Sequence, residues 1–408
     1  MLPPVLNPRH LTKCGNHLLR TLFPPPLHYP TKTRFCNIAQ RKWIHTRGTG
    51  SWLWSSQDLS IGSKVYQAPD LASNSSCRHH SSFRSKRKED FNSLKVTRFM
   101  ENILNHVIYE DDDVVAINKP IGITVFGQKV REHEDEKGYC VPIFAESEPD
   151  PNLCLADIMP LLRRHFKSPD LTIVHSIKMF YSGVLLLAKH KTGKDRMVQS
   201  LDRAQSQGTF YQSYLAITVG IPKQDALTKS SYYLKQERIK DRVLSLPTET
   251  VSKNLRKSGK IQLMEVQTTI LKKNEVLNCA LVRLDTVKDK WQCLEVYCTT
   301  QLCHVLGDYL YSGRVGKVFG VPILMEPHLA NVGKQKLPEE LKAALKLNQA
   351  KPGQMPLYLH RAKVDLTQMK PSKPLLSIVA PFPDHFLETL QKLQLEYSFD
   401  DIFDTKTK

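Results

Sequence analysis

The sequence has no run of 18 apolar residues, although 41% of its 408 residues are hydrophobic. A helix needs about 20 consecutive, mostly apolar residues to cross a bilayer, so this absence excludes a transmembrane helix. The hydrophobic content is nevertheless compatible with a sizeable core in a chain of this length. We therefore expect a globular protein over most of the chain, without a membrane span.

Cysteines paired at short, regular spacings are also absent. The nine cysteines are scattered along the chain, unlike those of a small secreted disulfide framework, so we expect reduced thiols. Cys293, Cys298 and Cys303 precede His304, but this is not the paired spacing of a structural zinc site. We interpret these cysteines as buried or half-buried thiols and predict no metal.

Acidic residues are missing from the start of the chain, where the first is Asp58 and eight Lys or Arg residues precede it. A basic leader without acidic residues, interspersed with Ser, Thr and short apolar clusters, is typical of a mitochondrial targeting peptide. We place this peptide at residues 1–48 and expect a protein of the mitochondrial matrix. The alternative is a disordered basic arm that stays attached and touches nucleic acid.

The net charge of +18 is concentrated in the first part of the chain. Residues 1–98 hold 16 basic and 4 acidic residues, a net of +12, which leaves +6 on residues 99–408. A protein that loses its leader is still basic, which fits a polyanionic partner such as RNA.

The composition divides the rest of the chain into three parts. Residues 49–95 are rich in Ser, Asn and Lys without apolar periodicity, and we interpret them as a disordered basic linker. Residues 96–391 form the expected globular domain, in which the acidic stretch 127–153 is interpreted as a surface insertion. Residues 392–408 are expected to be a frayed polar tail.

Within the domain, helix and strand patterns alternate without a βαβ rhythm, which favours an α+β domain built on a mostly antiparallel sheet. The polar region 223–260 gives no clear pattern. The predicted helices are 155–166 and 194–203; the predicted strands are 103–108, 114–120, 184–188, 210–219, 261–271, 280–284 and 293–298, with turns at 109–113 and 306–308.

One stretch, Thr172–Lys189, carries the strongest motif in the chain. It contains His175, then Ser182-Gly183 and an apolar run that ends in Ala-Lys. This pattern resembles the RluA-type pseudouridine synthases, whose motif is His-Arg-Leu-Asp, five residues ending in Ser-Gly, and an apolar strand ending in Ala-Lys. Ser176 stands at the position of the Arg, and Lys178 at the position of the catalytic Asp.

Further motifs resemble this family in the family's own order. They are Asn118–Gly122, Tyr211–Ala216 with Gly220, Leu306–Tyr311, Leu359-His360 and Ala380–Pro383. The resemblance covers about residues 100–390 and implies a pseudouridine synthase catalytic-domain fold, with a mostly antiparallel mixed sheet flanked by helices. It also implies an RNA substrate and the isomerisation of uridine to pseudouridine without a cofactor.

A second family motif, Gly-Arg-Thr-His-Gln-Leu-Arg, falls on Asp289–Glu295 when counted back from Gly307-Asp308. Its final Arg, which in the family pairs with the catalytic Asp, is Glu295. Both halves of that ion pair are therefore exchanged. The resemblance places Lys178, Glu295 and the retained Tyr214 in the catalytic site, and assigns Lys119, His175 and Lys290 to RNA contacts.

These substitutions bear directly on the chemistry. In the family a carboxylate breaks the C1′–N1 bond, by attacking the sugar or by removing its 2′ proton. A lysine is a cation at neutral pH and has no lone pair to offer. Lys178 and Glu295 are thus either a structural salt bridge with acid and base swapped, or a site in which Glu295 has become the carboxylate. Misalignment, or a different residue, is the third possibility. Tyr214 either stacks on uracil or packs the sheet.

The leading hypothesis is a mitochondrial protein that binds mRNA or rRNA through a degenerate catalytic site and supports RNA stability or ribosome assembly. An active isomerase that uses Glu295 is the first alternative. The second is a partner subunit of an active synthase that does not bind RNA itself. The expected partners include other mitochondrial pseudouridine synthases and RNA granule proteins.

Overall fold

The structure is a computed structural model that describes residues 94–403, apart from 127–152, 224–227, 241, 331–332, 334, 348–354 and 371–372. The chain divides after Ser75, and all described residues belong to the second unit. The predicted targeting peptide, the acidic insertion and nearly all of the predicted linker lie outside the described residues. None of the described helices is long and apolar enough to cross a membrane.

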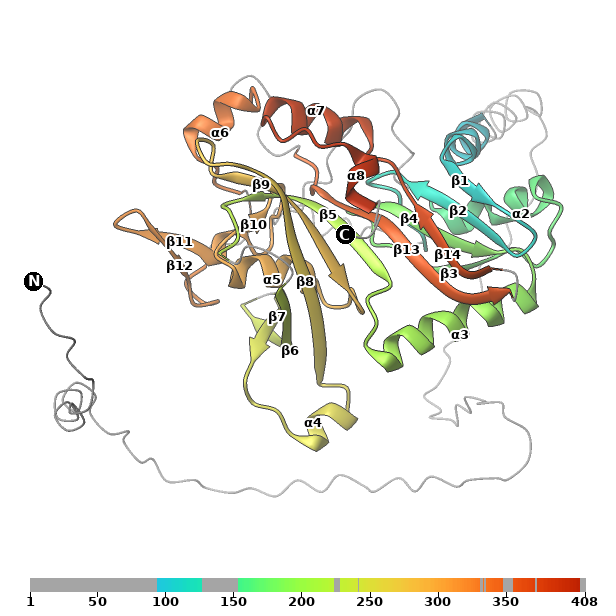
Figure 1. Ribbon diagram of the computed structural model, residues 1–408, viewed down its shortest axis with the longest axis horizontal. Helices are drawn as coiled ribbons and strands as arrows, with labels where there is room; N and C mark the ends of the chain where they lie inside the picture. The colour runs from blue at the N-terminus through green and yellow to red at the C-terminus, as the bar shows by residue number, and fades with distance from the viewer. Residues whose placement is uncertain are drawn as a thin grey trace, which may run out of the picture. The chain divides into compact units, whose positions relative to one another are not determined.

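A single twelve-stranded sheet forms the framework of this unit (Figure 1). Its strands are β1 Val107–Glu110, β2 Val114–Lys119, β3 Thr172–His175, β4 Ser182–Ala188, β5 Gln212–Val219, β6 Thr228–Ile239, β7 Arg242–Thr248, β8 Ile261–Asn274, β9 Cys279–Thr286, β10 His304–Val305, β13 Leu359–Lys370 and β14 Lys373–Val379. The strand order is β1-β2-β4-β13-β5-β9-β8-β6-β7, with β3 beside β4, β14 beside β13 and β10 beside β5. Among the described pairings, β4 with β13 is parallel and the others are antiparallel. The predicted α+β class with a mostly antiparallel mixed sheet is confirmed.

Helices cover both faces of this sheet, and a separate hairpin projects from it. The helices are residues 94–105, α2 Leu155–His165, α3 Lys191–Gln207, α4 Lys253–Lys257, α5 Cys293–Thr300, α6 Glu339–Ala344, α7 Asp384–Lys392 and α8 Phe399–Phe403. The hairpin consists of β11 Val315–Val318 and β12 Val321–Leu324.

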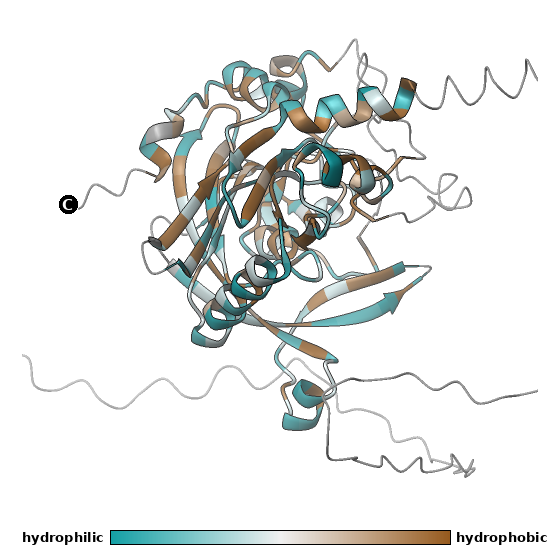
Figure 2. Ribbon diagram, turned by 90° about the vertical axis from the view of Figure 1, so that its right-hand side faces the viewer, coloured by the Kyte–Doolittle hydropathy of each residue, from teal (hydrophilic) through white to brown (hydrophobic). Residues whose placement is uncertain are grey.

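Alternation along β5 shows how the core is divided between the two faces. Tyr214 and Ala216 point to the face covered by α2 and α5, whereas Leu215 and Ile217 point to the face covered by α6, α7 and α8. Successive side chains of a strand point to opposite faces, so a strand buried on both sides is apolar throughout. The central strands are accordingly largely brown in Figure 2. Helix α3 covers the second face at its other end, over β2 and β4.

The predicted helix at 155–166 is confirmed as α2. Its buried residues Leu155, Ile158, Met159 and Leu162 recur at helical spacing. The Asp157 carboxylate accepts a hydrogen bond from the Cys154 backbone N–H, 2.8 Å away, at the first turn. The predicted helix at 194–203 is longer in the structure, because the His190 side chain caps its start and Gly208, in the left-handed conformation, ends it.

The predicted strand at 293–298 is wrong: this segment is the helix α5. Seven consecutive residues, Cys293 to Thr299, are buried, because the helix packs against the sheet on one side and is enclosed by neighbouring segments on the others. A short, continuously apolar segment has the same pattern in a buried strand and in an enclosed helix, so periodicity alone could not separate the two.

The predicted polar tail is also corrected in part. Leu393, Leu395 and Ile402 are buried, with Ile402 on α8. Phe399 packs edge-on against Phe382, with ring centroids 5.1 Å apart. The apolar residues of this segment alternate with polar ones, which hides them in an average over composition. The folded domain therefore extends to about residue 403.

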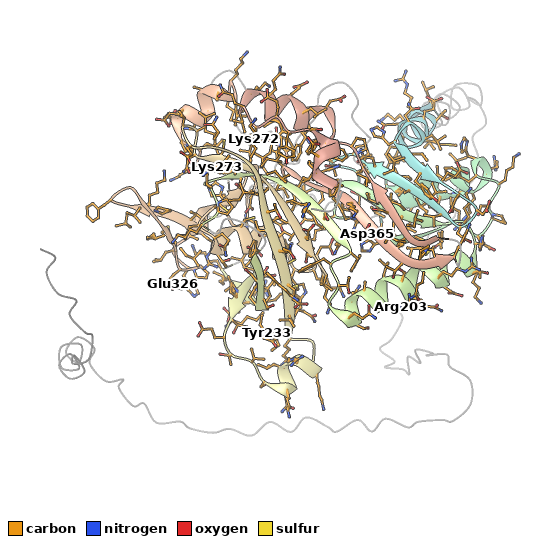
Figure 3. The ribbon with its side chains drawn as sticks, viewed as in Figure 1. Arg203, Tyr233, Lys272, Lys273, Glu326 and Asp365 are labelled. Carbon is orange, nitrogen blue, oxygen red and sulfur yellow. The ribbon has the colours of Figure 1, made fainter. Side chains whose placement is uncertain are left out.

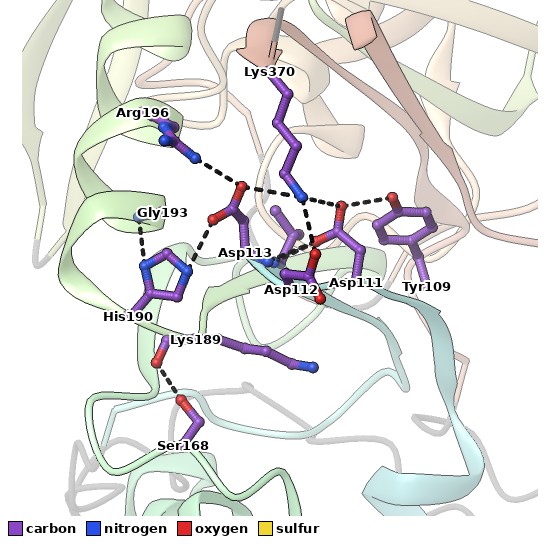
Figure 4. A network of polar contacts seen from close by, with 11 residues as sticks. Tyr109, Asp111, Asp112, Asp113, Ser168, Lys189, His190, Gly193, Arg196 and Lys370 are labelled. Atoms are coloured by element: carbon purple, nitrogen blue, oxygen red, sulfur yellow. Dashed lines mark hydrogen bonds and ion pairs between the residues drawn. The ribbon is translucent and has the colours of Figure 1, made fainter. Parts of the chain in front are cut away.

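An acidic turn joins β1 and β2 as predicted, but it covers residues 111–113 rather than 109–113, because β1 runs to Glu110. The predicted strand at 103–108 is wrong for residues 103–105, which end the helix 94–105. The turn forms part of the polar network of Figure 4. Asp111 accepts hydrogen bonds from the backbone N–H groups of Asp113 and Val114, each at 2.8 Å. Lys370 lies within 3.8 Å of the carboxylates of Asp111, Asp112 and Asp113. Burial raises the pKa of Asp111, but the hydrogen bonds and the charge of Lys370 outweigh it and lower the pKa overall.

We predict that Asp111→Asn lowers the stability of the domain at pH 7, and lowers it less at pH 3. A carboxyl group whose pKa is lower in the folded than in the unfolded chain stabilises the fold at neutral pH, and this contribution disappears as the pH falls through the folded-state pKa. Urea unfolding at both pH values measures the difference. Asp112→Asn is the matched control, since its side chain is 97% exposed; an equal effect of both variants would contradict the assignment.

Candidate functional site

A chain of two hydrogen bonds joins the two residues at the exchanged family positions. Lys178, in the loop between β3 and β4, donates to the Tyr181 hydroxyl at 2.7 Å, and this hydroxyl donates to Glu295 Oε1 at 2.6 Å. Burial and the charge of Glu295 raise the pKa of Tyr181 well above its ordinary value, which keeps the hydroxyl protonated as a donor. The lysine and the glutamate therefore interact through a tyrosine that the sequence analysis did not single out.

Glu295 lies behind this tyrosine, in the first turn of α5. Glu295 is 4% exposed and Tyr181 is 1% exposed. Among the described residues, Glu295 Oε2 has no hydrogen-bond partner. A substrate could reach this carboxylate only if Tyr181 or α5 moved. This position suits a structural group rather than a catalytic carboxylate.

A second carboxylate, Asp289, lies nearer the solvent in the segment between β9 and α5. Its side chain is 21% exposed. Asp289 Oδ2 accepts a hydrogen bond from the Tyr214 hydroxyl at 2.6 Å and lies 3.9 Å from Arg361 Nη1. The sequence contained Asp289 as the first residue of the second motif, where the family has Gly, but that alignment gave it no role.

Positive charges from different elements act on Asp289. Burial raises the pKa of its carboxyl group, but the charges of Lys178 and Arg361, together with the hydrogen bond from Tyr214, outweigh burial and lower the pKa overall. The carboxylate is therefore ionised at neutral pH. The pKa of His175 is lowered to about 4 by burial and by the charge of Arg361, so this imidazole is neutral at pH 7.

Arg361 on β13 joins this site to the signature motif. Its Nε donates to the Val184 carbonyl oxygen at 2.8 Å, and its Nη2 donates to the His175 carbonyl oxygen at 3.3 Å. In the parallel pair of β4 and β13, Arg361 is the partner of Gly183. A Cβ atom on Gly183 would overlap the Arg361 backbone, and its φ is +115°. Glycine is thus required where the two strands approach most closely.

The adjoining pair of motif residues is hydrogen bonded as well. Ser182 Oγ lies 2.9 Å from His360 Nδ1, and both side chains are buried. The Ser-Gly of the signature and the late Leu-His therefore meet, although more than 170 residues separate them. Their resemblance to family motifs has a structural basis at this contact.

Tyr214 agrees with one of its two interpretations, packing of the sheet, whereas Lys119 differs from its predicted RNA contact. Tyr214 is 0% exposed, and its ring packs edge-on against Tyr181 with centroids 6.0 Å apart. Its ring therefore packs the core, and its hydroxyl orients Asp289. Lys119 is 1% exposed and donates to the carbonyl oxygens of Pro120 and Met179, at 2.7 and 3.3 Å. Burial, and then the charge of Arg361, lower its pKa well below the ordinary value.

The assignment of Lys119 to an RNA contact conflicts with this burial, because a phosphate cannot reach its ammonium group. The residue instead fixes the loop that carries Lys178. The other two predicted RNA contacts differ from each other: His175 is half-buried and lies 3.3 Å from Gln212 Oε1, whereas Lys290 is exposed beside Asp289. Of the three, Lys290 has the accessibility that an RNA contact needs.

The five cysteines within the described part of the chain are free and buried. Cys293, Cys298 and Cys303 are among them, and no group of three or more His, Cys, Asp or Glu residues in this part is arranged to hold a metal ion. Burial raises the pKa of the Cys293 thiol far above its ordinary value, so it is a neutral neighbour of the site.

The chain is similar to several mitochondrial proteins over most of its length, although no family model matches it. It is 27% identical over 297 residues to the mitochondrial mRNA pseudouridine synthase RPUSD3 of Bos taurus, covering 71% of this chain and 78% of that protein. It is also 26% identical over 307 residues to the mitochondrial pseudouridylate synthase RPUSD4 of Homo sapiens, covering 72% and 71%. The structure of human RNA pseudouridylate synthase domain containing 4 has the same fold, with a TM-score of 0.53, 23% identity, and coverage of 75% of this chain and 99% of that one.

The similarity to these relatives and the shared fold agree with the family motifs found in the sequence. Two of these motifs meet in the sheet, at the contact of Ser182 with His360. The sequence similarity, the ordered motifs and the shared fold together support a member of the RluA-type pseudouridine synthase family that is similar to RPUSD3.

Proposed function

We propose that this protein binds RNA in the mitochondrial matrix, and that its residue 178 does not perform the carboxylate step of the family. The observation that carries the proposal is the bond from Lys178 to the Tyr181 hydroxyl, which puts a cation where the family has its catalytic Asp. The mitochondrial location is supported by the relatives, which are named as mitochondrial proteins. In this proposal the RNA is mitochondrial mRNA or rRNA, and the protein supports its stability or ribosome assembly.

A positively charged projection of the fold supports RNA as the partner. We call it the basic arm: residues 228–260, comprising β6, β7 and α4 (Figure 1). Its exposed basic residues are Lys229, Arg238, Lys240, Lys253, Arg256, Lys257 and Lys260. The Arg256 guanidinium lies 5.9 Å from the ring centroid of Tyr233, which Figure 3 labels on β6. Cations beside an aromatic ring suit phosphates and unstacked bases.

The alternatives differ in what supports them. An isomerase that uses Glu295 requires a buried carboxylate behind Tyr181 to reach the substrate, and the burial of both residues opposes it. A partner subunit that never binds RNA would not need the exposed charges of the basic arm. RNA binding therefore accounts for more of the described surface.

We predict that reversing three charges of the basic arm, in the triple variant Arg256→Glu, Lys257→Glu and Lys260→Glu, weakens RNA binding at least tenfold at about 0.1 M salt. The slope of log K against log salt should fall by about two, since each lost phosphate contact removes about 0.7 for single strands. The melting temperature should stay unchanged, because all three side chains are exposed. Fluorescence anisotropy with unmodified mitochondrial transcripts and the full chain measures the affinity.

The matched control is the triple variant Lys342→Glu, Lys346→Glu and Lys392→Glu, which makes the same change of charge at α6 and α7, at the opposite end of the sheet from α4 (Figure 1). Equal losses in both triples would mean that only the net charge matters. A wild-type protein that binds none of the transcripts, but co-purifies with an active synthase, would replace this proposal by the partner subunit.

A further inference from the structure

We infer that Asp289 supplies the carboxylate that position 178 lacks, so that the protein isomerises uridine with a catalytic group on a different segment of the chain. The inference rests on the proposed function, because it requires RNA at this site. It goes further in assigning a reaction and the residue that carries it. The family's acid and base positions are both substituted, yet a partly exposed carboxylate lies among the same residues, beside Tyr214 and Arg361.

Exposure separates the two carboxylates of the site. Asp289 has a side chain that is 21% exposed, whereas Glu295 is 4% exposed and is bonded to the buried Tyr181. A catalytic carboxylate must come within about 3 Å of the atom it attacks or deprotonates. Of the two, Asp289 is the one that solvent reaches.

Orientation is the second argument. Asp289 Oδ2 is held by the Tyr214 hydroxyl at 2.6 Å and faces Arg361 Nη1 at 3.9 Å. Arg361 is 0% exposed, and its Nη1 has no hydrogen-bond partner among the described residues, so this nitrogen keeps its positive charge directed at the Asp289 carboxylate. Tyr214 and Arg361 therefore hold the carboxylate through the same oxygen, Oδ2, which restricts its orientation.

Charge is the third argument. Several segments supply the ionisable groups that interact electrostatically with Asp289. They are His175 of β3, Lys178 of the following loop, Tyr211 just before β5, Tyr214 of β5, Arg361 of β13, and Cys293 of α5. The tyrosines and the cysteine are neutral at pH 7, since their pKa values are raised. Lys178 and Arg361 are the cations, so Lys178 keeps a function: it stabilises the charge of the relocated carboxylate.

The reaction balances with this group alone. The Asp289 carboxylate takes the 2′ proton of uridine, the C2′–H electron pair forms the C1′=C2′ bond, and the C1′–N1 pair leaves with N1 as the uracil anion. After the uracil turns, its C5 bonds to C1′ while C2′ recovers the proton from the Asp289 carboxylic acid. C5 then loses its proton and N1 gains one, which completes an isomerisation without a cofactor.

The test uses the full chain and unmodified transcripts that cover the mitochondrial genome, with chemical mapping of pseudouridine as the readout. The wild type should form pseudouridine, and Asp289→Asn should reduce the rate at least 100-fold while RNA affinity and melting temperature change little. Asp285→Asn is the matched control: this carboxylate on β9 is 9% exposed and pairs with Arg283 outside the site, so its variant should keep the activity. Glu295→Gln tests the alternative carboxylate and should lower the melting temperature. Asp289→Glu retains the charge, and we expect it to keep a measurable rate.

A second measurement does not depend on how Asp289→Asn folds. Lys178→Met removes a cation that lowers the pKa of Asp289. The carboxylate is then protonated more easily, so the acidic limb of the pH–rate profile should shift to higher pH than in the wild type. An unshifted acidic limb, or full activity of Asp289→Asn, would overturn the inference.

The two proposals fail in different ways. A wild type that binds the transcripts but forms no pseudouridine overturns the role of Asp289 and leaves RNA binding intact. A wild type that binds none of them overturns both. Activity that disappears in Glu295→Gln but persists in Asp289→Asn would return the catalytic role to Glu295.

Discussion

Gly183→Ala is expected to destabilise the domain by about 4 kcal/mol, through a strained backbone and an overlap with a neighbouring strand, each of which costs roughly 1–3 kcal/mol. The φ of Gly183 is +115°, a conformation that alanine rarely adopts, and the added Cβ would overlap the Arg361 backbone on β13. Neither strand can move easily, since both are buried in the middle of the sheet. Urea unfolding of the purified full chain measures the loss.

Gly259→Ala is the matched control for this prediction. Gly259 also has a positive φ, +70°, but no atom lies within 4 Å of the position that a Cβ would take, and it follows α4 on the surface. Its substitution should therefore cost only about 1 kcal/mol, for the backbone conformation alone. Similar losses in the two variants would show that the close approach of β4 and β13 is not what the glycine provides.

The order of the motifs made the sheet predictable, although not its exact pairings. Ser182-Gly183 and Leu359-His360 resemble family motifs because they pack against each other, so their presence already implied the fold. Helix α2 could be predicted because its buried residues recur at a spacing that no strand shows. Local patterns were sufficient wherever one face of an element is buried and the other is not.

Hydrophobic patterns did not predict the segments whose structure depends on tertiary contacts rather than on local sequence. Helix α5 is enclosed on all sides, so its sequence has no polar stripe to reveal the helical period. The burial of Leu395 and Ile402 depends on an apolar surface to which β5, β9 and α7 contribute, and no local segment contains all of these elements. Both elements needed tertiary contacts that one sequence does not contain.

The site illustrates the same limit. Lys178 and Glu295 could be found by their positions in known motifs, but the hydroxyl of Tyr181 that connects them could not. Asp289 was aligned with a glycine, and that alignment assigned it no role. Its proximity to Tyr214 and Arg361 arises from three segments that meet only in the folded sheet. An unexpected acidic residue beside a substituted catalytic motif is the signal that could have directed attention to it.

Arg361→Met is expected to destabilise the domain by about 3 kcal/mol, because it leaves two carbonyl oxygens of the core without their donor, at about 1–3 kcal/mol each. Arg361 is 0% exposed, and its guanidinium donates to the carbonyl oxygens of Val184 and His175. Methionine fills a similar volume but satisfies neither oxygen. The variant also leaves Asp289 with fewer positive charges nearby, so the pKa of that carboxyl should rise. Urea unfolding at pH 7 measures the loss of stability.

The role of Asp289 in that loss can be separated by a double-mutant cycle. Asp289→Asn removes the charge that Arg361 faces at 3.9 Å, so adding Asp289→Asn to Arg361→Met should restore part of the lost stability. Arg196→Met is the control for removing an arginine at the surface: its side chain is 42% exposed and pairs with Asp113, so it should cost at most about 1 kcal/mol. If Arg361→Met costs no more than Arg196→Met, then Arg361 does not hold the strands and the carboxylate together, and the orientation of Asp289 must come from Tyr214 alone.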